Sequence, residues 1–143
     1  MFRVPPNCIF EVDDFESDWT YKRPFDYIHA RELEGCIANE DLFFQRAFQH
    51  LAPDGWFEIQ ASYAKLASDD DSRRRAPNAM LWEKNIAEGF NDFGKSLQSA
   101  VTWKEKLIKA GFVDVQQDVR KVCAVFARHH TECRMQASTS ANV

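Results

Sequence analysis

The sequence lacks any close spacing of glycine residues. Its five glycines are scattered, and no two stand one residue apart: Gly35, Gly55, Gly89, Gly94 and Gly111. A loop that lets the backbone approach a phosphate or a dinucleotide needs closely spaced glycines. These 143 residues therefore hold no glycine-rich cofactor loop.

Long apolar runs are missing as well. Nowhere do about eighteen apolar residues follow one another, which is the length that a membrane-spanning helix needs. The N-terminal MFRVPPN has no apolar core of the kind that signal peptides carry. We expect a soluble cytoplasmic protein, with the nucleus as an alternative, and no membrane contact.

Clustered positive charge is scarce. The formal net charge is -4, and the single basic run, Arg73–Arg75, directly follows the acidic run Asp69–Asp71. The two runs largely cancel, whereas a nucleic-acid surface needs a clustered positive field. We expect no nucleic-acid partner and interpret residues 61–77 as a charged loop.

Cysteine pairs at metal-site spacing are absent too. Cys8, Cys36, Cys123 and Cys133 are far apart, whereas zinc and redox motifs place cysteines about two to four residues from each other. We interpret them as reduced thiols and expect no metal site. The run HHTEC at 129–133 is an alternative metal motif, but the polar residues 134–143 offer little to bury and favour disorder.

One core is the arrangement that length and composition favour, since 143 residues with 45% hydrophobic content form a domain of ordinary size. FDYIHAR at 25–31 and the end of LAPDGWFEIQ at 51–60 are predicted strands. Between them, residues 39–51 have apolar side chains at helical spacing, and Pro53-Asp54-Gly55 forms a turn. This order predicts a parallel β-α-β unit whose first strand is buried on both faces.

The remaining elements follow from the same signals. Thr102, with Glu105 three residues later, is a predicted helix N-cap, and Trp103, Leu107 and Ile108 are expected to point inward. The other predictions are a strand at 8–12 that ends at two acids, a helix at 78–93, a strand at 112–115 and a last, antiparallel strand at 119–126.

The runs PPNCIFEVDDFESDWTY, FDYIHAR, LAPDGWFEIQ and AGFVDV, in this order and spacing, resemble the fungal LaeA-like class I S-adenosylmethionine-dependent methyltransferases. The resemblance covers roughly residues 4–126. It implies an α/β, partial Rossmann-like fold with a mostly parallel sheet and a C-terminal antiparallel strand. Residues 1–126 would be the C-terminal half of the domain, truncated before the cofactor loop, and 127–143 a disordered tail.

The resemblance also assigns site residues. Asp13, Asp14 and Phe15 would contact the adenine side of the cofactor, because a carboxylate accepts a hydrogen bond from the adenine amine and a ring covers its face. Two acids that simply end a strand in water are the alternative. Trp19 is interpreted as a buried anchor rather than a cofactor contact.

His29 and Arg31 end the next strand, where the family places the methionine end of the cofactor and the substrate. Ligands of open α/β sheets bind beyond the carboxyl ends of the strands, which gives both residues a reason to be polar. Arg31 is a candidate cofactor contact and His29 a candidate catalytic base. A structural histidine bonded to a backbone carbonyl is an equal alternative.

Truncation would also strip a neighbour from FDYIHAR, because in the family the missing first strand lies beside it. An apolar strand with a free edge invites pairing. We therefore expect a homo-oligomer or a partner protein that covers this edge.

Three functions remain open at this point. The first is methyl transfer from S-adenosylmethionine to a small metabolite of fungal secondary metabolism. The second is a cofactor-free remnant that cyclises or isomerises a hydrophobic intermediate in an aromatic pocket. The third is a non-catalytic interaction module that binds a partner strand.

Overall fold

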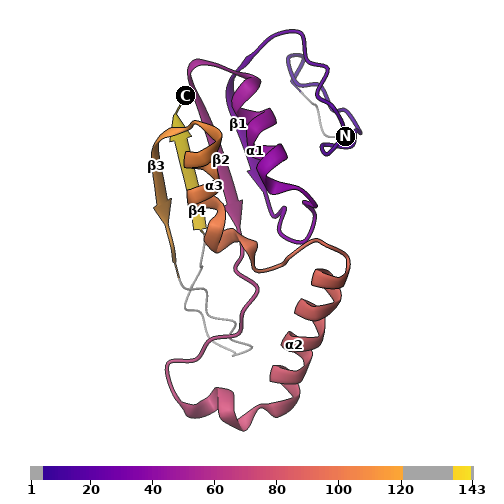
Figure 1. The fold of residues 1–143 in the computed structure, drawn as a ribbon, viewed down its shortest axis with the longest axis vertical. Coiled ribbons are helices and arrows are strands. Elements are labelled where there is room, and N and C mark those ends of the chain that lie inside the picture. Colours follow the sequence, from indigo (N-terminus) through magenta and orange to yellow (C-terminus); the bar gives the residue numbers. More distant parts are fainter. Residues whose placement is uncertain (1–4, 121–136, 143) are drawn as a thin grey trace.

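The computed structural model describes residues 5–120 and 137–142 (Figure 1). The described elements, in chain order, are β1 (Phe25–Arg31), α1 (Glu40–Gln49), β2 (Leu51–Ala61), η1 (Asp71–Arg75), α2 (Pro77–Asp92), η2 (Ser99–Thr102), α3 (Trp103–Ala110), β3 (Val113–Asp118) and β4 (Ala137–Asn142). The predicted β-α-β unit is thereby confirmed, and so is the long helix that follows it.

The four strands form one sheet in the order β1-β2-β4-β3. β1 pairs with β2 in parallel, and β4 is antiparallel to both β2 and β3. Because β4 opposes its two neighbours, β1, β2 and β3 all run in one direction. The predicted α/β class, with a mostly parallel sheet and a single C-terminal antiparallel strand, is confirmed.

The antiparallel strand of the described sheet is a different segment from the predicted one at 119–126. Residues 119 and 120 are outside any strand, and 121–126 lie outside the described residues. β4 instead occupies Ala137–Asn142, within the segment predicted to be disordered. That prediction considered only apolar burial, whereas a strand between two others gains backbone hydrogen bonds along both edges.

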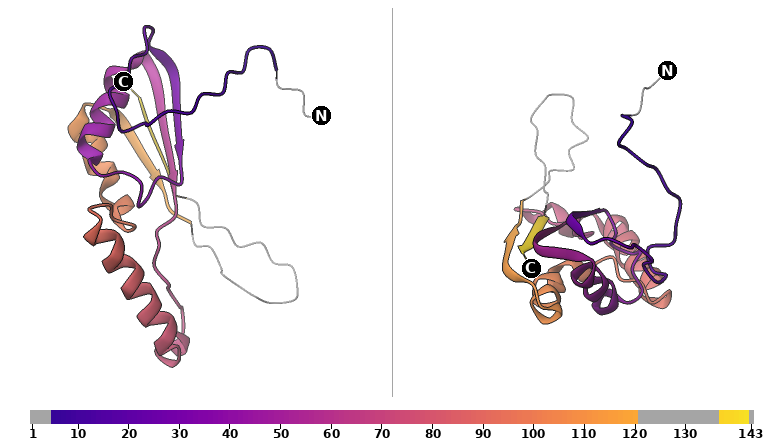
Figure 2. Two further views of the ribbon diagram at one scale, coloured as in Figure 1. Left: turned by 90° about the vertical axis from the view of Figure 1, so that its right-hand side faces the viewer. Right: turned by 90° about the horizontal axis from the view of Figure 1, so that it is seen from above.

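The predicted strand at 8–12 is wrong. Residues 5–24 contain neither helix nor strand, and Ile9, Phe10 and Val12 are all at least 80% exposed. Figure 2 shows the first part of this segment running away from the sheet. An extended apolar run becomes a strand only where a neighbour pairs with its backbone, and none of the described strands does so here.

The helix α1 begins at a side-chain cap and turns its apolar face to the sheet. The Asn39 carboxamide oxygen accepts a hydrogen bond from the backbone N–H of Leu42 at 3.0 Å, which satisfies an otherwise free donor. Phe43, Phe44 and Ala47 are buried against β2. The predicted turn Pro53-Asp54-Gly55 is a bulge inside β2, where the pairing register with β1 shifts.

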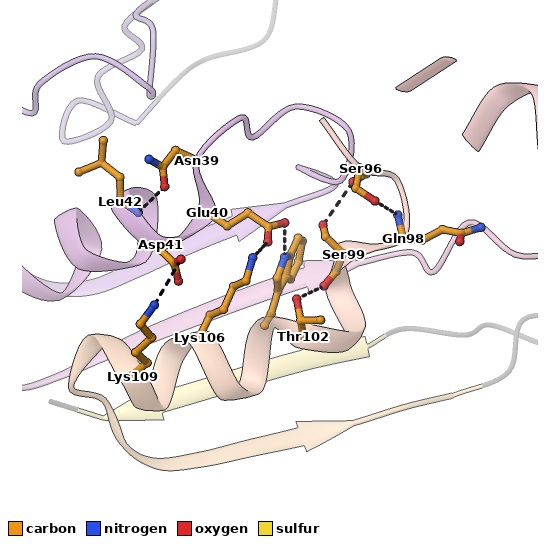
Figure 3. Close-up of polar contacts among 11 residues, drawn as sticks. Asn39, Glu40, Asp41, Leu42, Ser96, Gln98, Ser99, Thr102, Lys106 and Lys109 are labelled. Carbon is orange, nitrogen blue, oxygen red and sulfur yellow. Dashed lines mark hydrogen bonds and ion pairs between the residues drawn. The ribbon is translucent and has the colours of Figure 1, made fainter. Parts of the chain in front are cut away.

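The helix α3 starts differently from its prediction. Thr102 makes no cap; its hydroxyl donates to the carbonyl of Ser99 at 2.8 Å, because the 3-10 turn η2 runs directly into the helix (Figure 3). Gly111 ends the helix with φ 112°, and a side chain there would meet the Phe48 ring. Trp103 and Leu107 are buried as predicted, whereas Ile108 is 54% exposed.

Both α1 and α3 lie on one side of the sheet, and no described helix lies on the other (Figure 2). The core between this layer and the sheet contains a group of aromatic rings, with edge-on contacts between Phe44 and both Phe57 and Trp103 at centroid distances of 6.0 and 6.1 Å. Burial of each such side chain stabilises the fold by about 1.5–3 kcal/mol. On the bare face, Tyr27 and Trp56 remain half exposed, so β1 is not buried on both faces as predicted.

One polar contact links the two helices inside this layer. The buried Glu40 carboxylate of α1 accepts hydrogen bonds from the Trp103 indole at 2.7 Å and from the Lys106 ammonium of α3. The neighbouring Asp41 pairs with Lys109 at 3.5 Å but lies at the surface (Figure 3).

We expect Glu40→Ala to lower the free energy of unfolding by about 2 kcal/mol, because the buried indole N–H and the Lys106 ammonium lose their acceptor. Asp41→Ala is the matched control: it removes an acid from the same helical turn but only an exposed ion pair, so its effect should stay within about 0.5 kcal/mol. Urea denaturation followed by circular dichroism measures both. Equal effects of the two variants would contradict the role of Glu40.

Candidate functional site along strand β1

A cavity of about 340 Å³ lies along β1, between that strand and the N-terminal segment. Its lining is acidic and aromatic: Glu11, Asp13, Asp14, Phe15, Trp19, Tyr21, Phe25, Tyr27 and Ile28. Three of the four sequence-predicted cofactor residues, Asp13, Asp14 and Phe15, therefore meet at one cavity. Its wall contains three carboxylates and no cationic side chain, which suits a ligand with an aromatic ring and a positive charge.

The segment that carries these acids is fastened to the helical layer. The Glu16 carboxylate accepts from the backbone N–H of Ala38 at 2.6 Å and from the Lys95 ammonium at 2.7 Å. The Lys95 hydrogen bond holds the pKa of Glu16 below its usual value. Arg46, in the last turn of α1, donates to the Glu16 carbonyl and to the Asp18 carboxylate. Contacts before the helix and in its last turn thus hold residues 16–18.

Trp19 serves as an anchor of this segment. Its ring contacts Phe43 and His50 at centroid distances of 6.1 and 5.2 Å, and its indole N–H donates to the Phe15 carbonyl at 2.9 Å. The same ring borders the cavity. Packing thus fixes Trp19 while one side of it faces the site.

The two predicted adenine-side acids also organise their own turn. Asp13 accepts from the backbone N–H of Asp14 at 2.8 Å, and Asp14 accepts from that of Glu16 at 3.0 Å. Each carboxylate has further acceptor capacity beyond this one bond. The alternative, two acids that end a strand in water, is wrong in its strand, since Asp13 and Asp14 lie exposed in a segment without one. Their contact with a cofactor stays a prediction.

His29 belongs to a polar cluster on the bare face of the sheet. Its Nδ1 lies 3.5 Å from the Glu58 carboxylate and 3.4 Å from the Tyr27 hydroxyl, and Tyr27 donates a hydrogen bond to the same carboxylate. Gln60 donates to the other Glu58 oxygen at 2.8 Å. The cluster groups a phenol, a carboxylate and an imidazole, which are groups that can exchange protons with a bound molecule.

These contacts set opposite pKa shifts in Tyr27 and Glu58. The pKa of Glu58 is lowered, first by the Tyr27 hydrogen bond and then by Gln60. The pKa of Tyr27 is raised, because its phenol donates to Glu58 and ionisation would put two negative charges side by side. Sequence reasoning missed this pair, although the alternation of Tyr27, His29 and Arg31 already puts them on one face.

Arg31 does not join the cluster or the first cavity. It is the last residue of β1 and is exposed, and two acids, Glu32 and Glu34, follow it in the sequence. There the Glu34 carboxylate accepts from the backbone N–H of Ser62 at 2.6 Å and Glu32 from the Ser62 hydroxyl at 3.1 Å. Burial, with a smaller contribution from Glu32, raises the pKa of Glu34. The sequence analysis had not singled out these acids.

No three metal-ligating side chains converge within residues 5–120 and 137–142. The HHTEC run lies outside the described residues. None of the described helices combines the length and the apolar character that a bilayer crossing requires.

With this geometry in view, the chain can be compared with known proteins. Residues 3–117 match the methyltransferase domain family, so the chain belongs to that family. It is 31% identical over 138 residues to the methyltransferase cpsF of Aspergillus campestris, a match that covers 95% of this chain and 49% of cpsF. It is 39% identical over 109 residues to the methyltransferase pytC of Aspergillus terreus strain NIH 2624, covering 76% of this chain and 34% of pytC.

Among solved structures, a possible exported protein of Bordetella parapertussis has the same fold with a TM-score of 0.51 at 13% identity, over 92% of this chain and 42% of that protein. The chain thus spans about a third to a half of the length of the curated relatives it matches. Family membership, with fungal methyltransferases as homologues, is thereby established.

We expect Glu58→Gln to lower the pKa of Tyr27 toward the ordinary value of about 10 for tyrosine, because the neighbouring negative charge disappears. Since the folded-state pKa of Tyr27 is raised, its contribution to stability is present below the ordinary pKa and is lost as the pH rises through the folded value. Phenolate absorbance measures the titration, and subtraction of Tyr27→Phe assigns it. Glu88→Gln, which changes an exposed acid of α2, should leave the titration unaltered; an unaltered titration in Glu58→Gln would refute the contact.

Proposed function

We propose that the chain acts in methyl transfer from S-adenosylmethionine to a small metabolite of fungal secondary metabolism, as a LaeA-like class I methyltransferase. The observation that supports this most directly is the acidic and aromatic cavity beside β1. S-adenosylmethionine is a cation that carries an adenine ring, and both features are matched by Asp13, Asp14 and Phe15. The methyltransferase relatives from Aspergillus support the same reading.

The residues fit one end of this cofactor. Asp13 or Asp14 would accept a hydrogen bond from the adenine amine, and Phe15 would cover the ring. Arg31, which ends β1 outside this cavity, is the proposed partner of the carboxylate at the methionine end. The cofactor supplies an activated methyl group, so the chain needs chiefly to align the acceptor with it. His29 would accept the proton that the acceptor loses, with Glu58 stabilising the imidazolium that forms.

The glycine-rich approach to the cofactor is missing from the chain, and the outer edge of β1 is unpaired within the described sheet. We propose that a second polypeptide, a further copy or another protein, covers this edge. Ile9, Phe10 and Val12 flank the cavity-lining Glu11 in the sequence and are strongly exposed, so they offer further apolar contacts to such a partner.

A cofactor-free reaction is the second candidate, and the Tyr27–His29–Glu58 cluster supports it. A carboxylate, a phenol and an imidazole in contact could move a proton between two atoms of a bound hydrophobic intermediate, which is what an isomerisation or cyclisation needs. The two candidates differ in their need for S-adenosylmethionine.

Calorimetric titration of the purified, folded chain with S-adenosylmethionine tests the cofactor site. We expect micromolar affinity, and about a tenfold or greater loss in Asp14→Ala, because a charge-assisted hydrogen bond is worth about 1.5–3 kcal/mol. Asp92→Ala, at the exposed end of α2, is the control and should bind like the wild type. Absence of binding by a folded chain would rule out methyl transfer by the chain alone and favour the cofactor-free reaction or a partner-dependent site.

Sedimentation velocity over about 1 to 100 µM tests the covered edge. If copies of the chain pair there, the sedimentation coefficient should rise with concentration, and Phe10→Lys should weaken the association by placing a charge at the interface. Phe93→Lys is the control: it makes the same change at a phenylalanine that is 85% exposed, against 80% for Phe10, but that lies after α2, away from β1. A monomer at all concentrations would exclude self-association and leave only another protein for this role.

A further inference from the structure

A second cavity, of about 310 Å³, lies beyond the carboxyl end of β2, between the extended segment after that strand and the helix α2. It is lined by Tyr63, Ala64, Lys65, Leu66, Trp82, Glu83, Ile86 and Leu97. Figure 1 shows this segment and α2 side by side, below the sheet. Ligands of open α/β sheets bind beyond the carboxyl ends of the strands, and this cavity occupies that position.

The wall of the cavity is apolar, and its buried acid is already neutralised. The Glu83 side chain is only 10% exposed; it pairs with Arg73 at 3.4 Å and accepts from the backbone N–H of Leu66 at 3.2 Å. Gln98 satisfies the Ala64 carbonyl at 3.3 Å. The polar groups of Glu83 and Ala64 are thus already hydrogen-bonded within the protein. The part of a ligand that lies against them would therefore be apolar.

Large apolar side chains at this cavity are left open to water. Trp82 is 60% exposed, Tyr63 44% and Leu66 38%. Such a group of exposed aromatic and aliphatic side chains around a concave surface is typical of a binding site. Two aromatic rings in the wall favour a planar ring system, which can stack on them.

The charge at the wall comes from Lys65. In the part of the chain that the structure describes, its ammonium forms no ion pair, whereas the Glu83 charge is balanced by Arg73. Glu32 and Glu34 do not line the cavity, and both carboxylates are bonded to Ser62. A ligand with an acidic group is the one that complements this uncompensated charge.

We propose that this second cavity binds a small molecule consisting of an apolar aromatic ring system and an acidic group, with the rings against Trp82 and Tyr63 and the acid beside Lys65. The inference goes beyond the proposed function, because this cavity shares no lining residue with the one beside β1. Binding itself needs neither S-adenosylmethionine nor a partner. The volume lies near the lower end of the roughly 300–1,000 Å³ usual for ligand pockets, which fits about two fused rings.

Three naphthalene probes of nearly equal size test the site on the full chain: 2-naphthoate, 2-naphthol and protonated 2-(aminomethyl)naphthalene. Calorimetric titration without S-adenosylmethionine should give the tightest binding for 2-naphthoate, about fivefold tighter than for the ammonium probe, as an exposed charge pair allows. Lys65→Gln should reduce that preference to within about twofold. Lys84→Gln, which removes a neighbouring lysine that pairs with Glu88 outside the lining, should retain it.

Trp82→Ala provides the second test, since it removes an exposed ring from the wall and leaves the core unchanged. All three probes should bind at least about tenfold more weakly, while circular dichroism confirms the fold. In the wild type, the indole N–H resonance of Trp82, assigned with Trp82→Phe, should shift on addition of 2-naphthoate. Absence of probe binding, shifts confined to other tryptophans, or a preference for the ammonium probe would each overturn the proposal.

The outcomes separate this site from the proposed function. If the probes bind as expected but S-adenosylmethionine does not, methyl transfer by the chain alone is excluded and the site stands. If S-adenosylmethionine binds and the probes do not, the cofactor assignment stands and the proposed ligand site at the second cavity is wrong.

Discussion

The Glu40 carboxylate holds the helical layer together. It is the buried acid of α1 to which α3 is bonded, through the indole of Trp103 and the ammonium of Lys106. A carboxylate in this position is costly to desolvate, and only well-placed donors offset the cost. The arrangement therefore fixes α3 relative to α1, and with it the start of β3 after Gly111.

The position of this layer decides where chemistry can take place. Helices α1 and α3 lie on one side of the sheet (Figure 2). The apolar side chains of β2 are buried against them, and the alternate residues of β1 and β2 face outward. Tyr27, His29 and Glu58 meet on that outward face because strand alternation gives them no other direction. The same layer holds the N-terminal segment through Arg46, which creates the cavity beside β1.

The sequence predicted those elements whose signals are local. The apolar spacing of α1 and the bounds of β1 were predicted. A single C-terminal antiparallel strand was predicted too, but not at Ala137–Asn142. Errors arose where pairing between distant segments decides the outcome. Cys8–Val12 pairs with no strand of the described sheet, whereas the polar segment Ala137–Asn142 pairs with both β2 and β3. The meeting of Asp13, Asp14 and Phe15 was predicted from resemblance, but the Tyr27–Glu58 contact depends on register across β1 and β2.

Exposure of the polar cluster constrains whatever covers the bare face. At the surface, water solvates the His29 and Glu58 side chains, which are 38% and 25% exposed, so the cluster costs little. An apolar partner surface laid over it would remove that water and leave charged groups with unused hydrogen-bonding capacity. A chain that pairs with the edge of β1 must therefore leave this face wet or bring polar groups of its own. In both cases the cluster stays in contact with water or with polar groups of the partner. His29 can then exchange a proton with a bound molecule.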